Sequence, residues 1–185
     1  MTLALTYANV EGRPAAAPTQ LAAIAGANAR EEDHVDPVDL AQWIKDGRRG
    51  LRVIDVREGV DTGTYVIPGA VVVPLDSLSS LSASPGDQLV LYSDGGAHGA
   101  QGWGLLRMRG IRHVRVLKDG MAAWKEDELL HPVLPPAADA RGQELRARIR
   151  ALSLWFGGQP RLGDPTAVLA LPTRKAPRPR RRNTC

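Results

Sequence analysis

Four short apolar runs constrain the fold of this chain more than any other feature, because segments of helical periodicity separate them. The runs are rich in β-branched residues and cover residues 51–56, 71–73, 89–92 and 114–117. Short and almost continuous apolar strands are typical of parallel sheets that helices cover on both faces. The sequence therefore predicts a single α/β domain.

Helical patterns account for the segments between these runs. The first predicted helix spans residues 37–46, where Asp36 is the expected N-cap acceptor and Pro37 suits the first helical position. A second helix is expected over residues 99–109 and a short third one over 121–124. Their apolar positions predict core contacts for Trp43, Trp103, Leu105, Leu106 and Trp124.

The ends of the chain differ in composition from its middle. We expect an Ala- and Pro-rich extension over residues 1–33, the domain over 34–133, a linker and C-terminal helix over 134–173, and a disordered basic tail over 174–185. The C-terminal helix should pack back on the domain through Leu145, Ile149 and Leu152. Six of the 24 Lys and Arg residues belong to the tail, which has no acid, so 18 bases face 20 acids elsewhere.

The composition indicates which cellular compartment to expect and which metal sites to exclude. No apolar run approaches the ~20 residues that span a bilayer, and the N-terminus lacks the pattern of a secretory signal. We therefore expect a cytoplasmic protein with no membrane span. Cys185 is the one cysteine, which excludes an internal disulfide and a multi-cysteine zinc site. The histidines have no metal-ligand spacing, so neither a metal nor a cofactor is expected.

A glycine-rich loop joins the run 89–92 to the second helix. In a parallel sheet such a loop lies at the carboxyl ends of the strands, where ligands bind. Its glycines allow backbone N–H groups to surround a small anion, and the helix that follows adds a partial positive charge. The candidate anion-binding loop consists of Ser93, Asp94, Gly95, Gly96, Ala97, His98 and Gly99.

Several motifs in the same order resemble a rhodanese-like domain. They are VIDVRE at 53–58, IPGA at 67–70, VLYS at 90–93 with its glycine loop, and LKDGMAAW at 117–124. The resemblance runs over residues 34–131 and implies a parallel five-stranded sheet flanked by helices. It also implies sulfur transfer through a persulfide on a loop cysteine.

The loop departs from the family at its reactive positions. The family cysteine falls on Ser93, its glycine on Gly96, its arginine on His98 and the small residue that opens the helix on Gly99. A serine hydroxyl is far less acidic than a thiol and forms no stable equivalent of a persulfide. The resemblance therefore implies a domain without sulfurtransferase activity, which acts as a binding or regulatory module toward a small anion or a protein partner.

Other interpretations of these residues remain open. Ser93 could be a nucleophile of another class if a base such as His98 reached it, and Cys185 could carry sulfur. The basic segment from Arg174 to Arg182 could bind nucleic acid or an acidic surface. At the end of the first strand, Asp55 and Arg57 either line the ligand pocket or form an ion pair that braces the loops, and we expect the ion pair.

Overall fold

The computed structural model describes residues 33–61, 63–134, 136 and 139–163. Within them, five parallel strands form a sheet in the order β1-β5-β4-β2-β3. The strands are β1 (His34–Val35), β2 (Leu51–Asp55), β3 (Val71–Val72), β4 (Gln88–Tyr92) and β5 (Val114–Leu117). The predicted α/β class and parallel five-stranded sheet are confirmed.

Alternation along β2 and β4 divides the core into two layers. Val53, Val90 and Tyr92 pack into one hydrophobic cluster, while Ile54 and Leu91 pack into the other. Successive side chains of a strand point to opposite faces, so a central strand must be apolar at every position when both faces are covered. β4 lies at the centre of the sheet and is apolar and buried from Leu89 to Tyr92, whereas its first residue, Gln88, is polar and half-buried.

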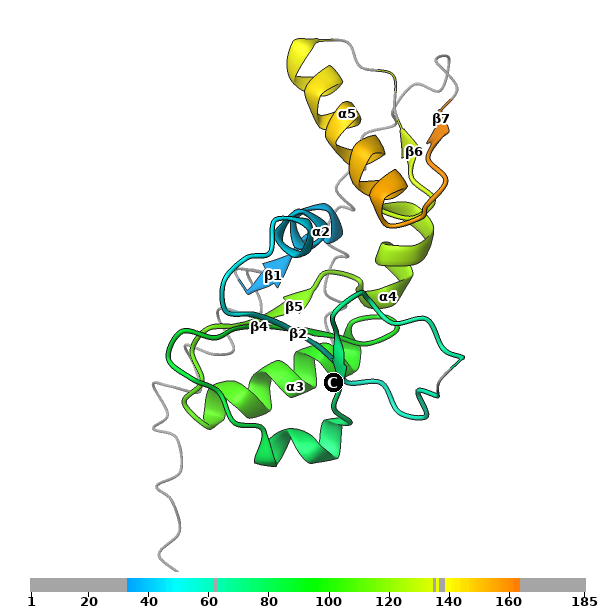
Figure 1. Ribbon diagram of the computed structural model, residues 1–185. Helices are drawn as coiled ribbons and strands as arrows, with labels where there is room; N and C mark the ends of the chain where they lie inside the picture. The colour runs from blue at the N-terminus through cyan, green and yellow to red at the C-terminus, as the bar shows by residue number, and fades with distance from the viewer. Residues whose placement is uncertain (1–32, 62, 135, 137–138, 164–185) are drawn as a thin grey trace, which may run out of the picture.

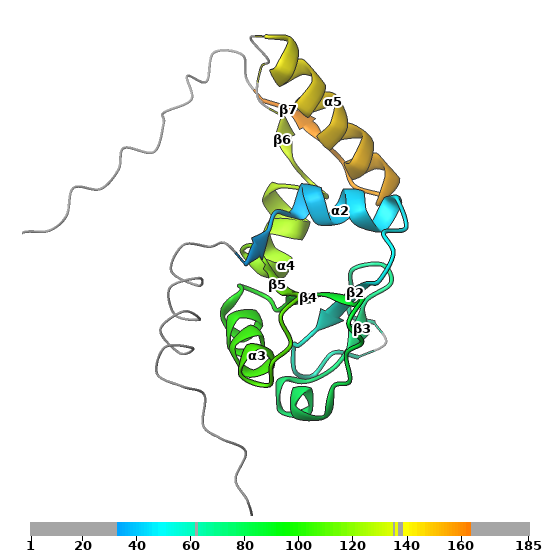
Figure 2. The same ribbon diagram turned by 90° about the vertical axis from the view of Figure 1, so that its left-hand side faces the viewer.

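Helices cover the two faces of the sheet (Figures 1 and 2). One face packs against α2 (Pro37–Lys45), α4 (Gly120–Ala122) and the π-helical turn η2 (Ala123–Asp127). The other packs against α3 (Ala97–Met108) and the 3₁₀ helix η1 (Leu75–Ser80). The two clusters lie on opposite sides of β4, which places the carboxyl end of this strand between both helical layers.

Two details of the predicted helices are wrong. Leu105 is 39% exposed, because α3 faces the sheet through Gly99, Gly102, Trp103 and Leu106, and Leu105 lies off that stripe. Asp36 is the N-cap residue of α2, but its side chain makes no capping hydrogen bond. Its carboxylate is 60% exposed and lies 4.0 Å from the ammonium of Lys118 instead.

The C-terminal helix is α5 (Ala140–Trp155), and Asp139 caps it by accepting a hydrogen bond from the Gly142 N–H at 2.7 Å. Only part of its predicted face is buried, since Leu152 is 1% exposed whereas Leu145 is 51% exposed. The reason is that α5 leans away from the sheet, with its C-terminal end nearest the domain (Figure 1). Arg148 joins it to Asp39 of α2 at 2.8 Å.

A second, small sheet lies beside α5. It pairs β6 (Val133–Leu134) with β7 (Arg161–Leu162) in parallel, so the segment expected to begin a linker starts within a strand. No helix among the described residues is long and apolar enough to cross a membrane. The extension 1–32, the tail and Cys185 lie outside the described residues.

Candidate functional site

The glycine-rich loop leaves β4 at its carboxyl end and enters α3 at Ala97. The helix therefore starts two residues earlier than the sequence predicts, and Ala97 and His98 belong to its first turn. Gly96 precedes it with a φ of 88°, a left-handed conformation that glycine adopts without strain. The turn at Gly96 therefore joins the loop directly to the first turn of α3.

Ser93, the first residue of the loop, is buried and only 2% exposed. Its Oγ accepts a hydrogen bond from the N–H of Gly99 at 3.3 Å, which ties the beginning of the loop to the first turn of α3. His98 is exposed, and no hydrogen bond joins its ring to Ser93. The serine–histidine pair that a nucleophile would need is therefore not formed.

The start of α4 supports the loop from below. The carbonyl oxygens of Ser93 and Asp94 accept hydrogen bonds from the N–H groups of Met121 and Ala122, at 2.8 and 3.0 Å. Gly120 makes this approach achievable, because a Cβ there would overlap the Ser93 carbonyl oxygen and its φ is 60°. The loop is thus fixed by main-chain contacts on a neighbouring element.

Asp55 and Arg57 form a buried ion pair beside the loop. The Arg57 Nη2 lies 2.6 Å from the Asp55 Oδ2, and the Asp55 side chain is fully buried. Arg57 also donates to the carbonyl of Tyr65 at 2.9 Å and lies 3.3 Å from the exposed carboxylate of Asp94. The hydrogen bond to Asp55 raises the pKa of Arg57, so its charge is permanent and already compensated.

Two tyrosines complete the packing around this ion pair. Tyr92 is buried, and its hydroxyl oxygen accepts a hydrogen bond from the N–H of Ile67 at 3.2 Å. Tyr65 accepts a hydrogen bond from the indole of Trp124 at 3.1 Å. Desolvation raises the pKa of both hydroxyls, so both remain neutral at physiological pH. The sequence predicted neither contact, because apolar periodicity does not show where a hydroxyl finds its partner.

Several backbone N–H groups of the loop have no hydrogen-bond acceptor among the described residues. The N–H groups of Asp94, Gly95, Gly96, Ala97 and His98 donate to no acceptor within the described residues. Orphan N–H groups at a glycine turn and a helix start are the donors that anion sites in proteins use. Asp94 opposes an anion here, because its side chain is 83% exposed and carries a negative charge at the same surface.

The family model of the rhodanese-like domain matches residues 36–127. Residues 36–127 form a rhodanese-like domain. The predicted family is confirmed, and β1 and the start of the C-terminal segment lie just outside the matched range.

The curated relatives of this rhodanese-like domain have two activities in their names. The "probable adenylyltransferase/sulfurtransferase MoeZ" of Mycobacterium tuberculosis is 30% identical over 102 residues, which cover 53% of this chain and 26% of that protein. The chain thus spans about a quarter of the length of the curated relatives it matches.

Solved structures that resemble the domain cover about half of this chain. A rhodanese-like domain from Anabaena sp. is 32% identical, with 50% of this chain and 73% of that chain covered and a TM-score of 0.44. A human single-domain sulfurtransferase is 26% identical, with 51% and 98% covered and a TM-score of 0.44.

Proposed function

We propose that this rhodanese-like domain has no sulfurtransferase activity and acts as a binding or regulatory module. The proposal is carried by Ser93, on which the family's sulfur-carrying cysteine falls when the motifs of the loop are matched. Its hydroxyl is buried and already engaged by the N–H of Gly99. The supporting elements of the loop are nonetheless retained, which favours a role that uses the shape of the loop.

The chemistry of sulfur transfer argues against catalysis at Ser93. The reaction needs a thiolate that accepts a sulfur atom and later releases it, and a thiol reaches that state because its pKa lies near 8.5 and falls further at helix N-termini. A hydroxyl has no such state near neutral pH. The nearby histidine, His98, is exposed and does not contact the hydroxyl, so no general base compensates.

The ligand of such a module would be a small anion or an acidic group on a protein partner. The unused N–H groups of residues 94–98 supply the donors, together with the positive end of the α3 dipole. The cation beside the loop, Arg57, is not free for the anion, because it is neutralised by Asp55 and approached by Asp94. We therefore propose weak binding that depends on backbone donors.

A thiosulfate–cyanide assay tests the loss of activity. The protein should show no turnover, and Ser93→Cys should gain it, because a thiol at this position would lie against the Gly99 N–H and the start of α3. Ser153→Cys is the matched control, since Ser153 is equally buried but lies in α5, away from the loop. It should remain inactive.

The relatives named as sulfurtransferases make a second outcome worth testing in the same assay. If the protein turns over and Cys185→Ala retains the activity, the proposal is wrong. If turnover is lost with Cys185→Ala, that thiol carries the sulfur, and the proposed absence of activity is wrong as well. Intact-mass measurement after exposure to a persulfide donor or an acyl ester would show an adduct on Cys185 or Ser93.

Titration with sulfate and thiosulfate, followed at the amide signals of residues 94–98, tests anion binding by the loop.

A further inference from the structure

A groove of about 650 Å³ lies between α5 and the small sheet of β6 and β7. The three elements lie side by side, away from the main sheet (Figures 1 and 2). The helix contributes one face to this α5 groove, from Gln143 to Leu154, and the strands contribute Leu134 and Leu162. None of the residues of the glycine-rich loop lines it, so the groove and the loop are separate sites.

Leucines on both sides make the α5 groove apolar and leave it open to solvent. Leu134 of β6 and Leu162 of β7 are register partners, so their side chains lie on the same face of the small sheet. Leu134 is buried, whereas Leu162 is 69% exposed and Leu154 of α5 is 53% exposed. The groove therefore has apolar surface that a docked partner would remove from water.

Two alanines keep the α5 side of the groove shallow. Ala147 and Ala151 are four residues apart, so they lie in one row along the helix, and both are exposed. Large apolar side chains in this row would fill the space in front of β6 and β7, but methyl groups leave it empty. The small side chains also allow a neighbouring helix to approach α5 closely.

The row beside the alanines consists of Arg146 and Arg150, which also line the groove. Neither forms an ion pair with a carboxylate among the described residues, in contrast to Arg148, which pairs with Asp39. Residues 139–163 contain five arginines and two acids, which gives this segment a formal charge of +3. Positive charge that the neighbouring residues do not balance is complementary to an acidic partner.

The charge and the apolar walls argue against three other occupants. A second copy in a symmetric dimer would bring the same positive face of α5 to the interface. The apolar run at residues 167–171 of this chain contains no acid, so it would leave both arginines unpaired. A nucleic acid would pair with the arginines but would leave the exposed leucines without an apolar contact. An occupant that is both apolar and acidic satisfies every wall of the groove.

We propose that the α5 groove binds an acidic amphipathic helix of a partner protein. Apolar side chains at helical spacing would cover Leu154 and Leu162, and Asp or Glu residues one turn apart would pair with Arg146 and Arg150. The face of α5 from Gln143 to Leu154 is about 17 Å long, which matches about three turns of a partner helix. The proposal does not depend on the function proposed for the glycine-rich loop, because the two sites share no residue.

Designed helical peptides of about 18 residues test the proposal on the full chain. One peptide has leucines along one face and glutamates beside them, and a second has lysines in place of the glutamates. Fluorescence anisotropy should show saturable binding of the glutamate peptide and binding of the lysine peptide that is at least about tenfold weaker. Equal affinities, or no binding of the glutamate peptide, would overturn the proposal. So would undiminished binding of a glutamate peptide with serines in place of its leucines, because charge alone would then be sensed.

Charge reversal on α5 locates the binding. Arg146→Glu and Arg150→Glu should each weaken the binding of the glutamate peptide by about fivefold and strengthen that of the lysine peptide. Arg141→Glu is the matched control, because Arg141 is an exposed arginine of the same helix that does not line the groove. It should leave both affinities unchanged, and an equal loss in Arg141→Glu would contradict the assignment to the groove.

Ala147→Phe tests the shape of the groove, since its ring would occupy the space that the partner helix needs. It should weaken the binding of the glutamate peptide by about tenfold or more. Leu145→Phe should not, because Leu145 is exposed on α5 but does not line the groove. Urea denaturation shows that each variant is folded.

Two further measurements identify the other occupants. Self-association of the free protein that Ala147→Phe abolishes would assign the groove to a second copy. Tighter binding of the glutamate peptide after truncation behind Gly163 would assign it to the C-terminal segment of the chain itself, because the truncation removes six bases and only one acid. Either result would overturn the proposal.

Discussion

At the scale of single residues, the ion pair of Asp55 and Arg57 is the contact on which the site most depends. Arg57→Ala would leave the Asp55 carboxylate, which is fully buried, without its cation. We expect the free energy of unfolding to fall by about 3–5 kcal/mol, as for other buried pairs that lose one partner. Urea denaturation measures this loss.

The surface pair of Arg52 and Asp87 is the matched control for that variant. Arg52 is 40% exposed, and its pair with Asp87 is open to solvent and to screening. Arg52→Ala should therefore change the free energy of unfolding by less than about 1 kcal/mol. Equal losses in the two variants would contradict the burial that the structure gives to Asp55.

The buried tyrosines predict a loss of stability at alkaline pH. Desolvation raises the pKa of Tyr92 in the folded state, so the unfolded chain releases this proton first. The stabilising contribution is complete below pH about 10 and decreases as the pH rises above that value. Thermal unfolding from neutral pH to about pH 11 should show the decline. The double variant Tyr65→Phe/Tyr92→Phe should flatten it, and an unchanged slope would argue against these two groups.

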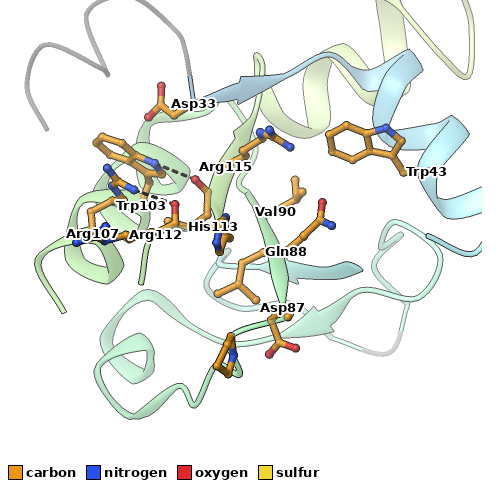
Figure 3. Close-up of a pocket in the computed structure, with 14 residues that line it drawn as sticks. Asp33, Trp43, Asp87, Gln88, Val90, Trp103, Arg107, Arg112, His113 and Arg115 are labelled. Carbon is orange, nitrogen blue, oxygen red and sulfur yellow. Dashed lines mark hydrogen bonds between the residues drawn. The ribbon is translucent and has the colours of Figure 1, made fainter. Parts of the chain in front are cut away.

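Part of the candidate site could be predicted from the sequence alone. Ser93 and the paired charges at the end of the first strand could be found because they follow a buried strand at fixed positions. Tyr65 and Gly120 could not, since their roles come from contacts between segments far apart in the chain. A cavity of about 510 Å³ at the amino-terminal ends of β4 and β5 (Figure 3) was also missed, because its lining residues come from segments far apart in the chain.

At the scale of elements, α5 distinguishes two leucines that the sequence treated alike. Leu152→Ala should lower the free energy of unfolding by about 2–5 kcal/mol, because Leu152 is 1% exposed and belongs to the core beside Trp124. Leu145→Ala on the same helix should change it by less than about 0.5 kcal/mol, since Leu145 is 51% exposed. Comparable effects from both would mean that α5 lies closer to the domain than described.

The elements themselves could largely be predicted from period and composition. The strands β2, β3, β4 and β5 were expected because β-branched residues recur in short runs, and α2 and α3 because apolar residues recur at helical spacing. The two-residue strand β1 was not expected from any such run. The pairing of β6 with β7 could not be expected, since each has two residues and a strand that short has no pattern. The tilt of α5 likewise depends on its packing against α2, and local sequence patterns do not predict contacts between such distant segments.

At the scale of the whole molecule, the distribution of charge predicts how the chain binds polyanions. Truncation after Thr173 removes six bases and no acid, so the formal net charge changes from +4 to −2. If the tail binds nucleic acid, retention of RNA at low salt should fall sharply in the truncated chain and be salt-dependent in the full one. Filter binding over a series of salt concentrations measures this. Unchanged retention would rule out the tail as the binding element.

The two edges of the main sheet are the strands β1 and β3, and each is only two residues long. Pro37 follows β1 closely, and Pro74 follows β3, so each edge soon meets a residue without an N–H donor. A foreign strand that docked beside either edge would find too few donors and acceptors to register against. Within the described residues, the edges of this sheet therefore give a docking strand only two residues to pair with, even though Val71 and Val72 are exposed on β3.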